Sequence, residues 1–239
     1  TQVGSSAASD VYKRQQIDTP HSRRRVSLAD YEFADLIDQQ DKVRLLIDPT
    51  SSYAQAAAMA MGRAMDDVII AAATGTAFTG ETGSGTEAAQ TAIAANVGAT
   101  TGLNIPKLAK AKEKFDLASV DPSIPRHIVV SPEQINNLLN VTEVTSSDFN
   151  TVKALVQGEI DTFLGFKFTV SNRLAKTGND RTCIAFAQDG ITLGIGKDVN
   201  ARIDERADKS YATQVYYCMS IGATRMEEAK VVEVQATES

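Results

Sequence analysis

The most regular pattern of apolar positions in the chain predicts one long helix. Between residues 53 and 69 small and apolar side chains recur every three or four positions, which is the spacing of one helix face. An Asp-Pro pair at residues 48 and 49 supplies an N-cap and a first-turn proline, and Gly75 is a stop signal. We therefore expect a helix over about residues 49–74, roughly 35 Å long at 1.5 Å per residue. The stripe consists of Tyr53, Ala56, Ala57, Ala60, Met61, Ala64, Met65, Val68 and Ile69.

Shorter helical patterns follow. Pro106 opens a helix with Leu108, Ala111, Phe115 and Ala118 on one face, while Lys107, Lys110, Lys112 and Lys114 mostly turn away and suggest a solvated face. Ser131-Pro132-Glu133-Gln134 is typical of a capping box with proline at the first helical position. A further helix is expected over residues 149–157. Residues 29–47 are interpreted as a short helix followed by a second short element.

The last third of the chain reads as strands. Val215, Tyr217, Met219 and Ile221 alternate with polar or small residues, a period of two. With the long helix before it and no regular βαβ repeat, this pattern indicates an α+β fold. Strands are expected at residues 76–79, 127–130, 166–170, 182–187, 191–195, 201–205, 214–221 and 230–235.

The first residues stand apart from these patterns. Residues 10–15 read Asp-Val-Tyr-Lys-Arg-Gln, which resembles a translated sequencing adapter. Our hypothesis is that residues 1–15 are an artefact, that natural sequence begins at about Gln16 and that the natural N-terminal part is missing. The alternative is a natural disordered leader. Residues 1–15 are set aside in the fold prediction, as a tag would be.

The amino-acid composition excludes several classes of protein. The 239 residues are 43% hydrophobic and 23% charged, with a net charge of −6 and only two cysteines. Such a chain can bury a real core, and an acidic chain is unsuited to coating DNA. No apolar run is long enough to span a membrane. Two cysteines in apolar stretches suggest buried, reduced thiols rather than a disulfide framework.

Candidate chemistry is sparse. The stretch from Gly80 to Glu87 is rich in glycine but lacks the lysine of a phosphate loop, so a flexible loop is favoured. Leu193-Gly194-Ile195-Gly196 is half of a dinucleotide fingerprint and is interpreted as a turn between strands. His21 and His127 lack metal-ligand spacing. We therefore expect no catalytic residue, cofactor or metal. A small hydrolase using Cys183 or Cys218 is kept as a distant alternative.

Two charged segments are candidates for contacts between subunits. Arg23, Arg24 and Arg25 form a basic run that suits phosphate or an acidic neighbour, or a solvated arm. A mixed-charge strand and turn near residue 205 suits subunits that pair edge to edge, or a solvated hairpin. Its charged residues are Arg202, Asp204, Glu205, Arg206, Asp208 and Lys209.

Taken in order, several stretches resemble the major capsid proteins of tailed bacteriophages. The resemblance covers the chain after Gln16, and its specificity lies in the order of the pieces. These are Asp18-Thr19-Pro20-His21-Ser22-Arg23-Arg24-Arg25, Asp48-Pro49-Thr50, Gly62-Arg63-Ala64-Met65-Asp66-Asp67, Asn150-Thr151-Val152-Lys153-Ala154-Leu155, Gly165-Phe166-Lys167-Phe168, Glu205 to Gln214 and Gly222-Ala223-Thr224-Arg225-Met226-Glu227-Glu228.

The resemblance implies the Hong-Kong-97-type capsid fold. Residues 49–74 then correspond to the spine helix of a peripheral domain spanning 29–120. Residues 121–196 correspond to the axial domain, and 197–239 to strands that return to the peripheral domain. Residues 16–28 correspond to the remnant of an extended loop that overlaps a neighbouring subunit.

The resemblance also implies a function. The chain would be a non-enzymatic major capsid protein that forms hexamers and pentamers of itself in an icosahedral head. The head would enclose double-stranded DNA without sequence preference, in a virion assembled in the host bacterial cytoplasm, with no membrane contact. Scaffolding, portal and decoration proteins are further candidate partners. An encapsulin-like compartment that holds cargo protein is the alternative with the same fold.

Overall fold

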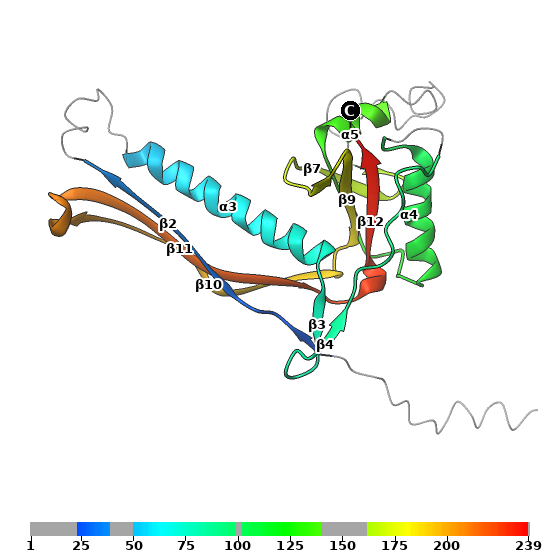
Figure 1. The fold of residues 1–239 in the computed structure, drawn as a ribbon, viewed down its shortest axis with the longest axis horizontal. Coiled ribbons are helices and arrows are strands. Elements are labelled where there is room, and N and C mark those ends of the chain that lie inside the picture. Colours follow the sequence, from blue (N-terminus) through cyan, green and yellow to red (C-terminus); the bar gives the residue numbers. More distant parts are fainter. Residues whose placement is uncertain (1–22, 39–49, 99–101, 140–161, 239) are drawn as a thin grey trace, which may run out of the picture.

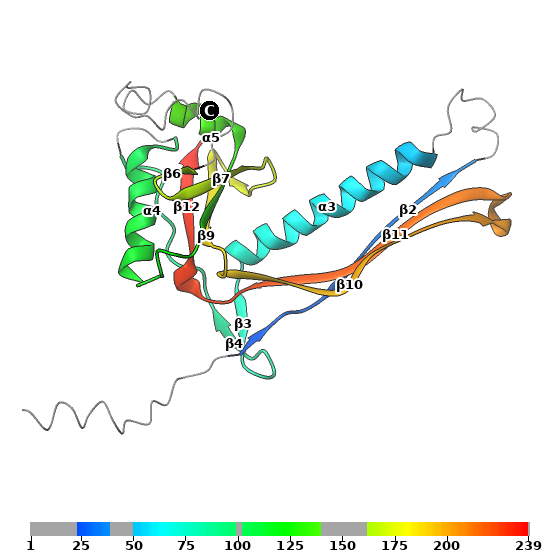
Figure 2. The same ribbon diagram turned by 180° about the vertical axis from the view of Figure 1, so that it is seen from behind.

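The computed structural model describes residues 23–38, 50–98, 102–139 and 162–238. A compact α/β part is joined to a long layer in which helix α3 (Thr50–Thr74) lies along a three-stranded ribbon (Figure 1). The ribbon consists of β2 (Ala29–Ile37), β10 (Ile191–Arg206) and β11 (Ala212–Arg225), and β11 lies in the middle. Seen from behind, the helix and ribbon again extend together from the compact part (Figure 2).

Helix α3 confirms the expected long helix over its described residues, while the predicted cap residues 48 and 49 lie outside them. Its stripe packs on one face of the ribbon. Met61, Met219 and Ile221 are buried there, with Tyr31 and Phe33 of β2 packed against them. This cluster is small. The rest of α3 is mostly partly or fully exposed, so the layer has much less buried core than the compact part.

Strand β2 corrects the prediction of a helix at the start of residues 29–47. Each of its residues from Ala29 to Ile37 pairs antiparallel with a residue of β11 between Ile221 and Thr213. Tyr31 and Phe33 are two positions apart and share the face under α3. The apolar pattern over so few residues fits a strand as well as a helix. Pairing with β11 makes this segment a strand. Residues 39–47 lie outside the described residues.

Strand β10 corrects a second prediction. The expected strands at 191–195 and 201–205 are one continuous strand, and the segment Leu193 to Gly196 is no turn. The register with β11 shifts between Ile195 and Lys197 and again between Lys197 and Asn200. These irregularities take up the extra residues without reversing the chain. Gly194 pairs with Gly222, where a Cβ would meet the Ser27 carbonyl oxygen at 2.3 Å, so the small residues admit the chain leading into β2.

The compact part is built on a mixed sheet of order β12-β9-β5-β7-β6, with β8 pairing β9. The strands are β5 (Arg126–Val130), β6 (Thr162–Phe163), β7 (Phe166–Val170), β8 (Lys176–Thr177), β9 (Asp180–Ala187) and β12 (Val231–Thr237). Strands β5 and β7 are parallel and the other pairs are antiparallel.

The core of the compact part unites distant segments of the chain. Phe115 and Leu108 of α4 (Ile105–Leu117) pack with Ile128 and Phe166 of the sheet and with Val232 of the last strand. The rings of Phe115 and Phe166 lie 6.0 Å apart. The described part of the predicted axial segment, residues 121–196, therefore shares its core with α4 and β12. A small sheet of β1 (Arg24–Arg25), β3 (Ala77–Thr79) and β4 (Gly85–Glu87) completes the fold.

Helix α4 confirms the helix opened by Pro106, with Asn104 as its N-cap, and corrects one detail. Lys107 does not turn away to solvent but is fully buried. Its ammonium group donates to the Gly102 carbonyl oxygen at 2.7 Å, and burial lowers the pKa of Lys107 to about 8. Lys107 lies one helical turn before the buried Ala111, so its side chain falls on the buried side of α4.

Helix α5 (Pro132–Leu139) begins where the capping pattern predicts. The Ser131 hydroxyl accepts from the Gln134 backbone N–H at 3.4 Å. The Gln134 side chain, however, bonds to neighbouring segments. Its Oε1 accepts from the Leu103 N–H at 2.8 Å, and its Nε2 donates to the Ala236 carbonyl oxygen at 3.4 Å. Gln134 thus ties the segment that leads into α4 to α5 and β12. The expected helix at 149–157 lies outside the described residues.

Candidate assembly surface

The three arginines of the basic run have different surroundings. Arg24 lies in β1 with its side chain only 8% exposed. Its Nε donates to the Met226 carbonyl oxygen at 2.9 Å, and its Nη2 pairs with Glu228 Oε2 at 2.8 Å. Arg24 therefore binds β1 to the turn that follows β11 in the same subunit. Arg25 donates to the Thr82 carbonyl oxygen at 2.6 Å, and Arg23 is exposed.

The mixed-charge segment lies at the far end of the ribbon, away from the compact part (Figure 1). Arg202, Asp204, Glu205 and Arg206 belong to the outer half of β10. The 3₁₀ turn η1 (Ala207–Lys209) follows and carries Asp208 and Lys209. All six side chains are exposed. The structure thus brings the predicted residues together on one strand and its turn.

An ion pair shapes the tip of this hairpin. Arg206 contacts Asp208 through two nitrogens, each 2.7 Å from a carboxylate oxygen, and donates to Gln214 Oε1 at 2.9 Å. The hydrogen bond from Arg206 lowers the pKa of Asp208 to about 2. Ser210 and Tyr211 follow with φ of 53° and 58°, the left-handed conformation that turns the chain into β11.

Strand β10 is also an edge of the ribbon. It pairs with β11 on one side, and the sheet order places no strand of the described residues on the other. Ile195 and Ile203 on this strand are about half exposed. A long edge with open backbone groups and exposed apolar side chains is suited to pairing with another chain.

Two buried charged groups that the sequence did not single out hold this architecture. Arg225, at the end of β11, is fully buried beneath the C-terminal end of α3. Its Nη1 donates to the carbonyl oxygens of Ala73 at 2.9 Å and of Gly75, and its Nη2 donates to that of Glu87 at 3.1 Å. The sequence prediction ended this strand at residue 221, so Arg225 lay outside it, in the observed extension of β11.

Glu238 is the second such group. Its carboxylate is 2% exposed and accepts from the Ser131 hydroxyl at 2.5 Å, from Arg181 at 2.8 Å and from Lys176 at 3.2 Å. The hydrogen bond from Arg181, together with those from Ser131 and Lys176, lowers the pKa of Glu238 to about 2. This carboxylate ties β8, β9 and the N-terminus of α5 together.

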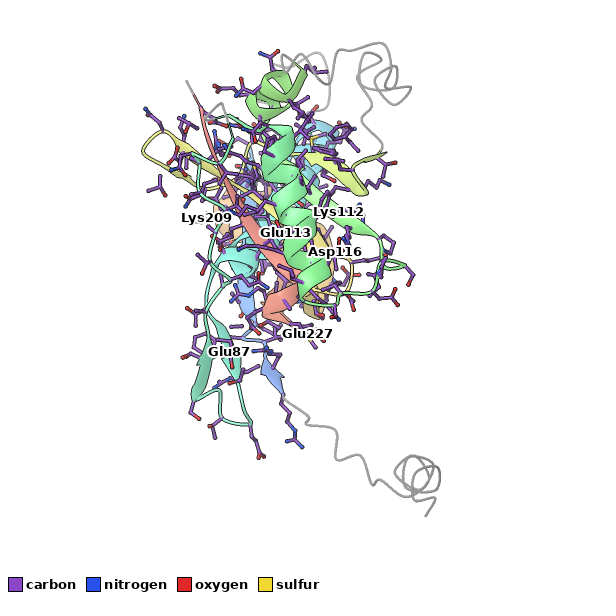
Figure 3. The ribbon with its side chains drawn as sticks, turned by 90° about the vertical axis from the view of Figure 1, so that its right-hand side faces the viewer. Glu87, Lys112, Glu113, Asp116, Lys209 and Glu227 are labelled. Carbon is purple, nitrogen blue, oxygen red and sulfur yellow. The ribbon has the colours of Figure 1, made fainter. Side chains whose placement is uncertain are left out.

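A hollow of about 600 Å³ lies beside α4 and the turn between β6 and β7. Lys112, Glu113 and Asp116 on the outer side of α4 lie near it (Figure 3). Asp116 is paired with Arg126 at 2.9 Å, and Arg126 stacks over Phe115 at 5.3 Å. These contacts hold α4 to β5, and the described residues that line the hollow form no catalytic constellation.

The two thiols of the hydrolase alternative have different surroundings. Cys183 is buried, and burial raises its pKa to about 12, whereas a nucleophilic cysteine needs a lowered pKa. Cys218 is also buried, and Lys197 Nζ lies 3.1 Å from its sulfur. His127 is stacked on Phe186 at 5.6 Å. Within the described ranges, no three His, Cys, Asp or Glu gather to hold a metal ion, and no helix could cross a membrane.

The solved structures with similar folds include capsids and heads of phages. The capsid of cyanophage P-SCSP1u is 18% identical with a TM-score of 0.67, over 90% of this chain and 74% of that one. A structure from Mycobacterium phage Che8 is 20% identical with a TM-score of 0.60, over 98% of this chain and 80% of the other. The head of Helicobacter pylori bacteriophage KHP40 is 11% identical with a TM-score of 0.65, over 90% and 76%.

Sequence comparison gives the same answer. No curated protein matches the chain significantly. The model of a family described as phage capsid protein matches residues 2–238. That range includes residues 2–15, which the structure does not describe, so the hypothesis of an artefact there stays a prediction. A family match over nearly the whole chain, on a fold shared with phage heads, shows that this chain belongs to the phage capsid protein family.

Proposed function

We propose that this phage capsid protein is the major subunit of an icosahedral head, with the Hong-Kong-97-type arrangement in which α3 is the spine helix. One observation carries the proposal. The helix and ribbon form a long layer with a small core, and no described strand covers the charged and apolar edge at the end of β10. Such a layer is suited to contacts with neighbouring copies, because shells distribute their stability over many repeated interfaces.

The parts of the subunit then take different roles. The compact sheet with residues 121–196 serves as the axial domain at the centre of each hexamer and pentamer. The layer of α3, β2, β10 and β11 serves as the peripheral domain and spans the shell. The arginine run and the charged end of β10 face neighbouring subunits, with Arg24 acting through its own subunit because it is already bound to Glu228.

The same proposal includes the contents and partners of the head. It encloses double-stranded DNA without sequence preference, is assembled in the host bacterial cytoplasm and uses scaffolding, portal and decoration proteins. The subunit has no enzymatic role, and the raised pKa of Cys183 supports that view. The comparisons do not favour an encapsulin-like compartment.

Electron microscopy and sedimentation of the purified protein test the proposal. We expect closed shells, or rings of five and six subunits, in the assembled fraction. A Phe115→Ala variant is the matched control, because it damages the core of the compact part and lowers assembly through folding. Dispersed monomers that persist when the neighbouring head genes are co-expressed would contradict the proposed function.

A further inference from the structure

The outer half of β10 is a regular, unpaired strand edge. From Asn200 to Arg206 its register with β11 runs unbroken, between the irregularity that precedes Asn200 and the turn η1. The sheet order leaves the other side of this stretch without a neighbouring strand in the described residues. Its outward N–H and C=O groups therefore provide a template for one more strand.

The side chains at the centre of this stretch are self-complementary. Arg202 pairs in register with Tyr216 and Asp204 with Gln214, so both point to one face, whereas Ile203 pairs with buried Val215 and points to the other. Ile203 is 49% exposed because it lies at the edge of the ribbon. Neither Arg202 nor Asp204 forms an ion pair within the described residues.

We propose that β10 pairs antiparallel with β10 of a second copy, about a two-fold axis that passes beside Ile203. This inference rests on the proposed function and names one of its subunit contacts. Pairing the whole stretch from Asn200 to Arg206 with itself sets Ile203 opposite its own copy. Arg202 then faces Asp204 of the partner subunit, and by symmetry the same ion pair forms twice.

The charges select this register over its neighbours. Side chains repeat on a face every second residue, so the competing symmetric registers centre on Arg202 or on Asp204. Each of these sets a like charge directly against itself across the axis, which is destabilising in an antiparallel pair. Only the register centred on Ile203 joins opposite charges and buries the two isoleucine side chains against one another.

The geometry also suits a shell. A two-fold axis perpendicular to the sheet keeps both copies of α3 on the same side of one continuous sheet of order β2-β11-β10-β10-β11-β2. A closed shell requires every subunit to present the same face to the interior, and two-fold axes of a shell run perpendicular to its surface. The proposed pairing meets both requirements when the ribbon lies in the plane of the shell.

Charge reversal tests the ion pairs. Arg202→Asp sets Asp against Asp204, and Asp204→Arg sets Arg against Arg202, so each single variant should lower the yield of particles about tenfold or more. The double variant exchanges the two charges and should restore the yield. Co-expressing the two single variants should also restore it, because a mixed pair regains both attractions. Circular dichroism of each variant checks its folding.

Disulfide trapping tests the register. Opposed residues of an antiparallel pair have Cα atoms about 4.5–5.5 Å apart, within the range for a disulfide. Particles of the Ile203→Cys variant should become linked dimers when oxidised glutathione accepts the two electrons and two protons of the new thiols. Leu36→Cys, at a similarly exposed position on β2, is the control and should stay monomeric. The native thiols are buried.

The outcomes separate this inference from the proposed function. If wild-type particles form but the Ile203→Cys variant does not link, or if the double variant is as defective as the single ones, the β10 pairing is wrong while the capsid role stands. If no particles form even when the neighbouring head genes are co-expressed, the proposed function fails. Linked dimers of Ile203→Cys in solution would then still support the pairing, and their absence would overturn it too.

Discussion

The guanidinium group of Arg225 closes the C-terminal end of α3, and its Nη1 lies 2.9 Å from the Ala73 carbonyl oxygen. The last carbonyl groups of a helix have no partner within the helix. A buried cation satisfies several of them at once and interacts favourably with the negative end of the helix dipole. Arg225 thus joins the end of β11 to the end of the helix that β11 supports.

We predict that Arg225→Met lowers the free energy of unfolding by about 3 kcal/mol, because buried carbonyl oxygens lose charged donors. Urea unfolding followed by circular dichroism measures the loss. Arg202→Met, at an exposed position of β10, is the control and should leave unfolding of the isolated subunit within about 0.5 kcal/mol of wild type. An equal effect of the two substitutions would refute the capping role.

The second prediction concerns Glu238 and acid. Its pKa is lowered on folding from 4.5 to about 2. A carboxyl group with a lowered pKa contributes stability that is complete above its unfolded pKa and is lost as the pH falls through its folded pKa. We expect the contribution, about 2 kcal/mol, to disappear between about pH 5 and pH 2.

Urea unfolding at several pH values checks this expectation. Glu238→Gln should be less stable than wild type at pH 7, and the difference should shrink as the pH falls toward 2. Asp204→Asn removes an exposed carboxylate with no ion pair in the described residues and is the matched control. A difference for Glu238→Gln that stays constant over this pH range would show that the ionised carboxylate is not the cause.

The third prediction concerns the two cores. Met61→Ala removes a buried side chain from the small cluster under α3, at a cost of about 2–3 kcal/mol. Because the main core lies in the compact part, we expect faster hydrogen exchange in α3 and β2 with little change in β5 and β9. Phe115→Ala should speed exchange in β5 and β9 instead. Uniform acceleration by Met61→Ala would indicate one cooperative unit.

The fourth prediction concerns the ion pair of Asp67 in α3 with Arg173 in the turn before β8. Both side chains are about 40–45% exposed, so the pair is screened by solvent. We expect Asp67→Asn to change the free energy of unfolding by less than about 1 kcal/mol, less than Arg225→Met does. A double-mutant cycle with Arg173→Gln measures the coupling. Coupling of several kcal/mol would show that this contact holds α3 against the compact part.

The fifth prediction concerns the thiols. Because burial raises the pKa of Cys183 to about 12, its thiolate is scarce near neutral pH. We expect a thiol reagent to modify Cys183 in the native protein only as fast as the chain unfolds, and urea to abolish the protection. Mass spectrometry of the labelled peptides measures the rate at Cys183. Rapid labelling of native Cys183 would revive the hydrolase alternative.

Local patterns in the sequence determined the elements whose signals are strong over many residues. The stripe from Tyr53 to Ile69 indicates α3 by itself, because an alanine-rich helix with a repeating apolar face needs little help from its neighbours. The alternation from Val215 to Ile221 likewise indicates β11. The order of short motifs also carried the resemblance that the family match confirms.

Only the tertiary structure decided those features that depend on contacts between residues far apart in the sequence. Residues 29–37 form a strand only because β11 offers its edge, and 191–206 remain one strand because bulges absorb the extra residues. Arg24 and Arg225 look like surface charges in the sequence, yet Glu228 and the end of α3 hold them inside. Burial and strand pairing depend on segments that are far apart in the chain, so they cannot be predicted from a short stretch of sequence.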